Sequence, residues 1–175
     1  MEKTKRILII GGPGSGKTSV LQTIEKNNFK VHHEISREVT ANAQKSGIEQ
    51  LFLTDPFAFS NQLLDGRIQQ FKNAASGINF YDRGIPDVPA YHVFTGDKIP
   101  EVFMKACKEY RYDQVFFLPP WEEIYESDNE RYETYDQAVV LGDILLDFYK
   151  KLDYSPISVP KSSIENRYNF IIEQL

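Results

Sequence analysis

The sequence predicts an α/β fold built around a parallel β-sheet, and two observations lead to that prediction. Short apolar runs alternate with longer stretches in which apolar residues recur at helical spacing, as in a series of βαβ units. The first of these runs, Arg6–Ile10, leads directly into a glycine-rich turn. With 175 residues, 41% of them apolar, the chain is long enough for one domain with an ordinary core, so we expect residues 1–175 to form a single domain.

The alternation can be followed along the whole chain. The strands that it predicts are Arg6–Ile10, Lys30–His33, Ile78–Tyr81, Gln114–Leu118 and Pro156–Val159. Helices are expected between them: one that begins at Lys17, then Ser36–Gln44, Pro56–Ala75, Glu101–Glu109 and Tyr135–Leu152, and a last one capped by Ser163. This order favours a parallel sheet with helices on both faces, which is a three-layer arrangement.

The bulk composition excludes several classes of protein. A net charge of −5 argues against a nucleic-acid-binding protein, which usually presents a basic face. Cys107 is the only cysteine, so neither an internal disulfide nor a cysteine-based zinc site is expected. We find no signal peptide and no apolar run that could span a bilayer, and we therefore expect a cytoplasmic protein that makes no membrane contact.

Residues 11–18, GGPGSGKT, fit the phosphate-loop pattern G-x-x-x-x-G-K-[ST] between a strand and a helix. Glycines let backbone N–H groups wrap the phosphates of a nucleotide, and the helix N-terminus adds a favourable dipole. Lys17 is expected to reach the β- and γ-phosphates, and the Thr18 hydroxyl to ligate Mg²⁺. The predicted nucleotide-binding residues are Gly12, Gly14, Ser15, Gly16, Lys17, Thr18 and Ser19.

A second group of charges follows the third predicted strand. Asp82 comes directly after an apolar run, where an acid can hold Mg²⁺ or its water, and Arg83 next to it can face a phosphate. The alternative is an ordinary turn aspartate that caps the next segment. Together with the phosphate loop, this position favours the metal-binding role for Asp82.

The second predicted strand ends at Glu34, in the segment VHHEISRE. A carboxylate there can accept the proton of an attacking hydroxyl, and Arg37 can clamp a phosphate of the substrate. The alternative is a set of surface ion pairs at the start of a helix. His32 and His33 are neighbours on a strand and point to opposite faces, so we expect structural roles for them rather than one shared metal.

Residues 120–136 are polar, charged and rich in tyrosine, and they lie between a strand end and a long helix. A lid that closes over phosphates has this character, and Arg131 is its candidate for stabilising charge in the transition state. A solvated charged helix, in which Arg131 pairs with neighbouring glutamates, explains the same composition.

Two further segments are candidates for contacts with the small molecules. Residues 160–162, after the last strand, can form one wall of the base pocket, and the absence of an N-K-x-D tetrad makes ATP the default nucleotide. On the third predicted helix, Phe59, Gln62 and Arg67 are candidates for binding an acceptor, with Phe59 as a possible stacking surface.

The segments GGPGSGKT, EISREV, FYDRGIPD, DNERYE and VPKSSIENRY occur in an order that resembles a family of small predicted ATPases. This family is grouped with the nicotinamide riboside kinase domain of NadR and with the TRPL-translocation-defect proteins, under the label of an AAA-type domain. The resemblance implies a nucleoside-kinase-like P-loop fold with parallel strands in the order 2-3-1-4-5. It also implies roles for the following residues: Gly14, Gly16, Lys17 and Thr18 at phosphates and Mg²⁺, Glu34 at the acceptor hydroxyl, Asp82 and Arg83 as the acid–arginine pair, and Arg131 in the lid.

The leading functional hypothesis is a Mg²⁺-dependent kinase that transfers the γ-phosphate of ATP to a hydroxyl of a nucleoside-like acceptor. The lid offers one arginine where many nucleotide kinases carry several, which argues against a phosphorylated acceptor. Two alternatives remain open at this point. One is an ATPase or GTPase in which Glu34 or Asp82 orients water, and the other is a non-enzymatic protein whose binding surface responds to the nucleotide.

Overall fold

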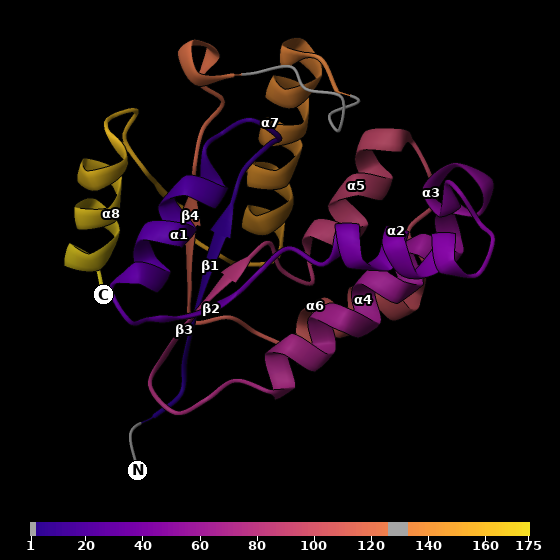
Figure 1. The fold of residues 1–175 in the computed structure, drawn as a ribbon, viewed down its shortest axis with the longest axis horizontal. Coiled ribbons are helices and arrows are strands. Elements are labelled where there is room, and N and C mark those ends of the chain that lie inside the picture. Colours follow the sequence, from indigo (N-terminus) through magenta and orange to yellow (C-terminus); the bar gives the residue numbers. More distant parts are fainter. Residues whose placement is uncertain (1–2, 126–132) are drawn as a thin grey trace.

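A computed structural model describes residues 3–125 and 133–175 of the chain (Figure 1). Its centre is a five-stranded parallel sheet in the order β2-β3-β1-β4-β5, as the sequence predicted. The strands are β1 Lys5–Ile10, β2 Lys30–His32, β3 Ile78–Asp82, β4 Gln114–Phe117 and β5 Ile157–Ser158. The helices are α1 Lys17–Lys26, α2 Ser36–Lys45, α3 Leu51–Thr54, α4 Pro56–Lys72, α5 Asp87–Thr95, α6 Glu101–Glu109, α7 Tyr135–Lys151 and α8 Ile164–Glu173, with a 3-10 turn, η1, at Glu122–Ile124.

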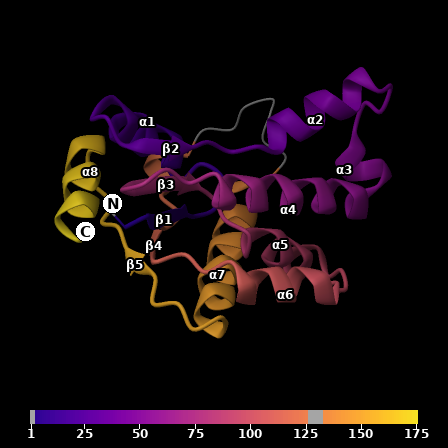
Figure 2. The same ribbon diagram turned by 90° about the horizontal axis from the view of Figure 1, so that it is seen from below.

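The sheet separates two apolar cores, because side chains alternate across a strand. On β1, Ile7 and Ile9 pack with α1 and α8, whereas Leu8 and Ile10 pack with the helices of the opposite face. Figures 1 and 2 show α1 and α8 together on one side, and α2 to α6 gathered on the other. The predicted three-layer α/β arrangement is therefore confirmed.

The helix boundaries follow local capping signals. Asp55 Oδ1 accepts from the backbone N–H of Ala58 at the start of α4, and Ser163 Oγ accepts from Asn166 N at the start of α8. Thr134 and Gln137 form a reciprocal capping box at the start of α7. These polar contacts stand at positions that a sequence pattern can reveal, and the cap predicted at Ser163 is confirmed.

Two helices among the described residues were not expected, the short α3 and the longer α5. Residues 87–95 form α5 directly after the Asp82–Arg83 pair, although the sequence there carries Pro86 and Pro89. Pro86 precedes the helix and Pro89 lies in its first turn, where the backbone N–H needs no partner within the helix, so neither proline interrupts it. Within the part of the chain that the structure describes, no helix is long and apolar enough to cross a membrane.

The N-terminal half of α7 packs directly against the phosphate loop. A Cβ atom placed on Gly12 would lie 2.6 Å from the carbonyl oxygen of Ala138, one turn into α7. Backbone oxygen cannot move aside as a flexible side chain can, so Gly12 is required here for the close approach of loop and helix. The geometry of the loop therefore depends on a helix more than a hundred residues further along the chain.

We predict that Gly12→Ala lowers the free energy of unfolding by about 1–3 kcal/mol, because the added methyl group must push α7 away from the loop. Denaturant unfolding followed by circular dichroism measures the change. Gly66→Ala is the matched control: its added Cβ meets only the mobile end of the Ile35 side chain, and alanine favours the surrounding helix α4. Equal stability of the two variants would contradict the close packing inferred for Gly12.

Candidate functional site

The phosphate loop joins β1 to α1 and has the backbone shape that its sequence requires. Gly14 and Gly16 adopt φ of 71° and 83°, a region that glycine occupies without strain. Lys17 is buried, and its ammonium group donates to the carbonyl oxygens of Gly11 and Gly12, each at 2.9 Å. Thr18, in contrast, is exposed at the first turn of α1. The loop thus presents a helix N-terminus and an exposed hydroxyl, with the lysine folded against its own loop.

Burial and neighbouring charges both shift the pKa of Lys17. Burial lowers the pKa of Lys17 to about 8, and the positive charge of Arg83 acts in the same direction, while Asp82 and Glu34 oppose the shift. A buried ammonium group loses the hydration that stabilises its charge, which is the physical cause of the main effect. Lys17 therefore lies close to the acids at the ends of β2 and β3.

Asp82 ends β3 at the edge of the sheet that carries the phosphate loop. The register pairs it with Ile9 of β1, which lies two residues before Gly11 at the start of the loop. The residue is only 6% exposed, and its Oδ1 atom makes no hydrogen bond within the described part of the chain. Burial raises the pKa of this carboxyl group, which Lys17 and Arg83 partly counteract. A buried carboxylate oxygen without a hydrogen-bond partner, at this edge of the sheet, is suited to binding a cation.

The predicted metal ligands, Asp82 and Thr18, carry oxygen atoms, which are the donors that Mg²⁺ prefers. Mg²⁺ is usually held by one or two protein oxygens, with waters and substrate phosphates completing its shell. No cluster of three or more histidine, cysteine or acidic side chains suited to a metal occurs among residues 3–125 and 133–175. The donor set therefore fits a nucleotide-bound Mg²⁺ better than a metal held by the protein alone.

Glu34, which follows β2, is held by two arginines from other elements. Its Oε1 atom lies 3.1 Å from Arg67 Nη2 on α4, and its Oε2 atom lies 2.6 Å from Arg83 Nε, directly after β3. The Oε1 atom also accepts from the backbone N–H groups of Ile35 and Ser36. We call Glu34, Arg67 and Arg83 the carboxylate–arginine cluster.

This cluster is sheltered from water. The side chain of Arg67 is 4% exposed, that of Arg83 15% and that of Glu34 22%. Although burial alone raises the pKa of Glu34, the guanidinium groups of Arg67 and Arg83 outweigh it and lower the pKa to about 2. The carboxylate is thus ionised at every physiological pH, and the alternative of an exposed ion-pair set at a helix start does not describe it.

The other predicted site residues have different surroundings. Ser19 lies on α1 next to Thr18, whereas Arg37 lies exposed in the first turn of α2. Gln62 lies on the exposed side of α4, about 140° around the helix from the buried Arg67. Arg131 lies outside the described residues. The roles assigned to these four residues stay predictions.

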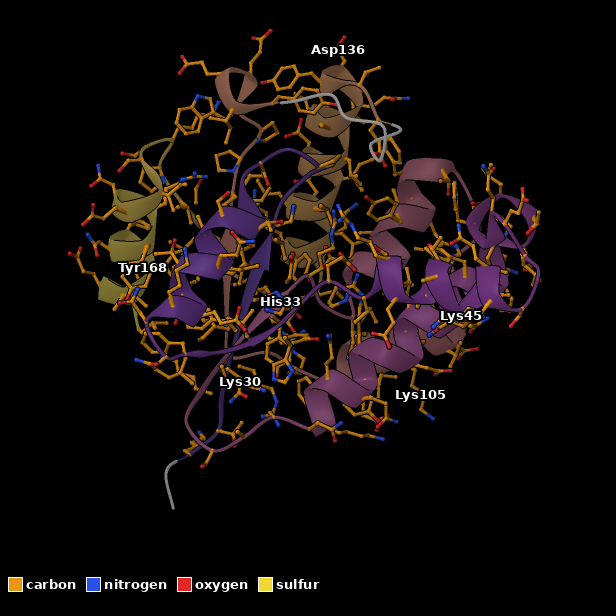
Figure 3. All side chains as sticks on the ribbon, viewed as in Figure 1. Lys30, His33, Lys45, Lys105, Asp136 and Tyr168 are labelled. Atoms are coloured by element: carbon orange, nitrogen blue, oxygen red, sulfur yellow. The ribbon has the colours of Figure 1, made fainter. Side chains whose placement is uncertain are left out.

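The two neighbouring histidines take part in separate contacts. His33, labelled in Figure 3, pairs with Glu25 of α1 at 3.1 Å. His32 stacks on Tyr81 and lies 3.3 Å from the Asn79 amide oxygen. Each ring contacts a different neighbour, as expected for side chains that point to opposite faces of a strand.

Several residues of this region had no signal in the sequence. Arg167 reaches from α8 to the phosphate loop, where its Nη1 atom donates to the carbonyl oxygen of Ser15 at 3.3 Å. Its guanidinium group lies 5.6 Å from the centre of the Trp121 ring. Asp87 and Tyr149 are buried beside the cluster and hydrogen-bonded to each other. All three contacts join parts of the chain that are far apart, and the only hint in the sequence was the second acid in DRGIPD.

The fold and the phosphate loop define a P-loop protein with the architecture of nucleoside and nucleotide kinases. A family model described as an AAA domain matches residues 6–167. Because the match spans most of the sequence, the chain belongs to this AAA-domain family, in agreement with the resemblance seen in its motifs. No curated protein matches the sequence significantly.

Solved structures of kinases share the fold at low sequence identity. The chain is similar to a thymidylate kinase from Candida albicans, with a TM-score of 0.71 and 18% identity over 98% of this chain and 91% of that one. It is also similar to a deoxyadenosine kinase from M. mycoides, with a TM-score of 0.69 and 16% identity over 97% of both chains. A third similar structure is a NadR protein in complex with NR, with a TM-score of 0.67 and 18% identity. That match covers 97% of this chain and 50% of the NadR chain.

We predict that Glu34→Gln destabilises the protein at neutral pH by about 3–5 kcal/mol, because two sheltered guanidinium groups lose their counter-charge. The folded-state pKa of Glu34 lies below its ordinary value of 4.5, so its contribution is complete above about pH 4.5 and is lost as the pH falls toward about 2. Unfolding free energies from pH 7 to pH 3, measured by denaturant titration, should show the two proteins converging toward acid. A constant difference over this range would contradict the ion-pair origin of the effect.

Proposed function

We propose that this protein is a Mg²⁺-dependent kinase that transfers the γ-phosphate of ATP to a hydroxyl group of a small, nucleoside-like molecule. The observation that carries the proposal is the convergence of Lys17, Asp82 and the carboxylate–arginine cluster at one edge of the sheet. Simple nucleotide binding needs the first two of these features. A carboxylate held by two arginines next to them is suited to an acceptor.

The nucleotide half of the site follows from the phosphate loop. Lys17 exchanges its contacts with Gly11 and Gly12 for oxygens of the β- and γ-phosphates, and the loop N–H groups bind the remaining oxygens. Thr18 and Asp82 hold Mg²⁺, which when bound neutralises charge on the phosphates. Arg167 reaches the loop at Ser15 and lies against the ring of Trp121, and we expect the base of the nucleotide on this side, with residues 160–162 as candidates for its contacts.

In the acceptor half, Glu34 accepts a hydrogen bond from the acceptor hydroxyl. This hydrogen bond orients the hydroxyl oxygen of the acceptor toward the γ-phosphorus. A bond forms from this oxygen to phosphorus as the bond to the bridging oxygen of ADP breaks, and the hydroxyl proton passes to the Glu34 carboxylate and then to water. A pKa of about 2 makes Glu34 a weak base, but phosphoryl transfer through a loose transition state depends mainly on position and charge. Arg83, and Arg131 from the proposed lid, stabilise the charge of the transferring group.

The nucleoside-like acceptor is inferred from the surroundings of Glu34 and from the proteins that share the fold. α2 and α4 border this side of the site, and they carry Arg37, Phe59, Gln62 and the buried Arg67. Both arginines of the cluster already pair with Glu34, so neither is free to bind a phosphate on the acceptor, and this favours an uncharged hydroxyl at the point of transfer. A deoxyadenosine kinase and a NadR protein solved with NR share this fold.

We predict that ADP release from Mg²⁺–ATP rises at least about tenfold when the correct nucleoside is added, because an acceptor hydroxyl replaces poorly placed water. A coupled assay with a panel of nucleosides, pyridine ribosides, vitamins and sugars measures this, and mass spectrometry identifies the phosphorylated product. ADP release that is the same with every compound would favour the ATPase or GTPase alternative. No release at all, with nucleotide still bound, would favour a non-enzymatic binding protein.

The contribution of Glu34 is tested in the same assay with Glu34→Asp, which keeps the charge but withdraws the carboxylate from the acceptor. Glu38→Gln, an exposed acid in the first turn of α2, is the matched control. We expect Glu34→Asp to lower kcat by about 100-fold and Glu38→Gln to leave it nearly unchanged. Equal activity of the two variants would exclude Glu34 from the reaction.

We also predict that nucleotide affinity depends on pH through Lys17. Phosphates bind the charged lysine, whose pKa in the free protein is about 8, so binding takes up a proton above that pH and the Kd rises about tenfold per pH unit. Calorimetric titrations in buffers of different ionisation enthalpy measure the proton uptake, which should rise from near zero at about pH 6.5 to near one at about pH 9. Lys26→Gln, on the exposed end of α1, should leave the uptake unchanged, and an uptake that is flat over this range would contradict the role of Lys17.

A further inference from the structure

Asp87 is a buried acid that the proposed reaction does not use. It stands in the first turn of α5 and is 1% exposed. Its Oδ2 atom accepts two hydrogen bonds, one from the backbone N–H of Gly84 at 2.9 Å and one from the Tyr149 hydroxyl of α7 at 2.5 Å. Its Oδ1 atom has no partner among the described residues. An acid so placed is costly to bury, so the contacts that it makes must be explained.

These contacts fix the turn that carries Arg83. Arg83 adopts a φ of 68°, a left-handed conformation that is rare for residues other than glycine and costs energy to maintain. Asp87 holds the peptide that follows it, at Gly84, while the backbone N–H of Arg83 donates to Ile9 of β1 at 3.2 Å. The turn is therefore anchored on both sides of the strained residue.

The left-handed conformation of Arg83 determines where its side chain lies in the candidate site. With its backbone in this conformation, Arg83 places its Nε atom 2.6 Å from Glu34. The turn also has little room to move, because a Cβ atom on Gly84 would meet Leu8 at 2.7 Å and the Tyr149 hydroxyl at 3.0 Å. Tyr149 thus both supports the Asp87 carboxylate and packs against the turn itself.

We infer that Asp87 and Tyr149 are positioning residues, which hold Arg83 in its left-handed conformation and so keep its guanidinium group against Glu34 and the transferring phosphate. This inference rests on the proposed kinase function for its effect on the rate, but the effect on the conformation of Arg83 is independent of it. Neither residue needs to touch the substrate. They act through the single turn between β3 and α5.

The test compares two tyrosines of the same region. Tyr149→Phe removes the hydroxyl that binds Asp87, and Tyr154→Phe removes a buried hydroxyl that accepts from the backbone N–H of Tyr112 instead. The two rings contact each other, at 5.4 Å between their centres, so the variants match in burial and surroundings. Tyr149→Phe keeps the ring and avoids the loss of folding that removal of the Asp87 carboxylate could cause.

We expect Tyr149→Phe to lower kcat by about 10- to 100-fold with little change in the KM for ATP, because the phosphate loop is untouched while Arg83 is displaced. Tyr154→Phe should stay within about twofold of the unaltered protein at a comparable loss of thermal stability. In an Arg83→Ala background, Tyr149→Phe should cause no further loss, since its effect passes through Arg83. Equal rates for the two tyrosine variants, or additive losses in the double variant, would overturn the inference.

A second measurement separates this inference from the proposed function. Crystal structures of the unaltered protein and of Tyr149→Phe show the φ of Arg83 and its distance to Glu34 whether or not an acceptor is known. We expect the variant to lose the left-handed conformation or the ion pair. If both persist unchanged, the inference is wrong even if the protein is a kinase, and if both are lost in a protein without kinase activity, only the proposed function is wrong.

Discussion

The contact between Glu34 and two arginines is the interaction on which the arrangement of the candidate site depends. It ties the end of β2 to α4 through Arg67 and to the end of β3 through Arg83. Because all three side chains are sheltered from water, removal of Glu34 would leave two guanidinium groups without their shared counter-charge. The cluster therefore sets the relative positions of three elements as well as the charge at the edge of the sheet.

If the protein is the proposed kinase, the same contact determines how the acceptor enters. Glu34 is already saturated by two guanidinium groups and two backbone N–H groups, so an arriving hydroxyl must share the carboxylate with them or displace one. Arg83 lies beside the ring of Tyr91 and near the like charge of Lys17 in the phosphate loop. In the proposed reaction, the γ-phosphate of ATP would give Arg83 a second anionic partner. In the proposed reaction, nucleotide binding and access to Glu34 would then be two parts of one charge balance.

Much of this organisation could be predicted from the sequence, but for unequal reasons. The phosphate loop and the place of Asp82 after an apolar strand are local patterns, and the position of each strand relative to β1 then follows from the order of the sheet. The partners of Glu34 could not be predicted, because Arg67 is distant in sequence and Gln62, on the same helix, was an equally plausible candidate. Only the rotation of α4 against the sheet, which tertiary packing sets, buries the first and exposes the second. The path of Arg167 to Ser15 depends on the packing of α8 against α1 in the same way.

Helix α7 explains why the two halves of the site cannot be treated separately. Ala138, near its start, packs on Gly12, and Tyr149, eleven residues further along, holds the turn of Arg83, so a single helix about 16 Å long between them touches both halves. The start of α7, marked by Asp136 in Figure 3, also adjoins the segment proposed as a lid. There Tyr125 donates to the carbonyl oxygen of Glu133, and its ring packs on Tyr135. A helix moves nearly as a rigid body, since its packed side chains resist independent shifts. Because Ala138 and Tyr149 lie on this one helix, a shift of α7 against Gly12 would also move the hydroxyl that binds Asp87 beside the turn of Arg83.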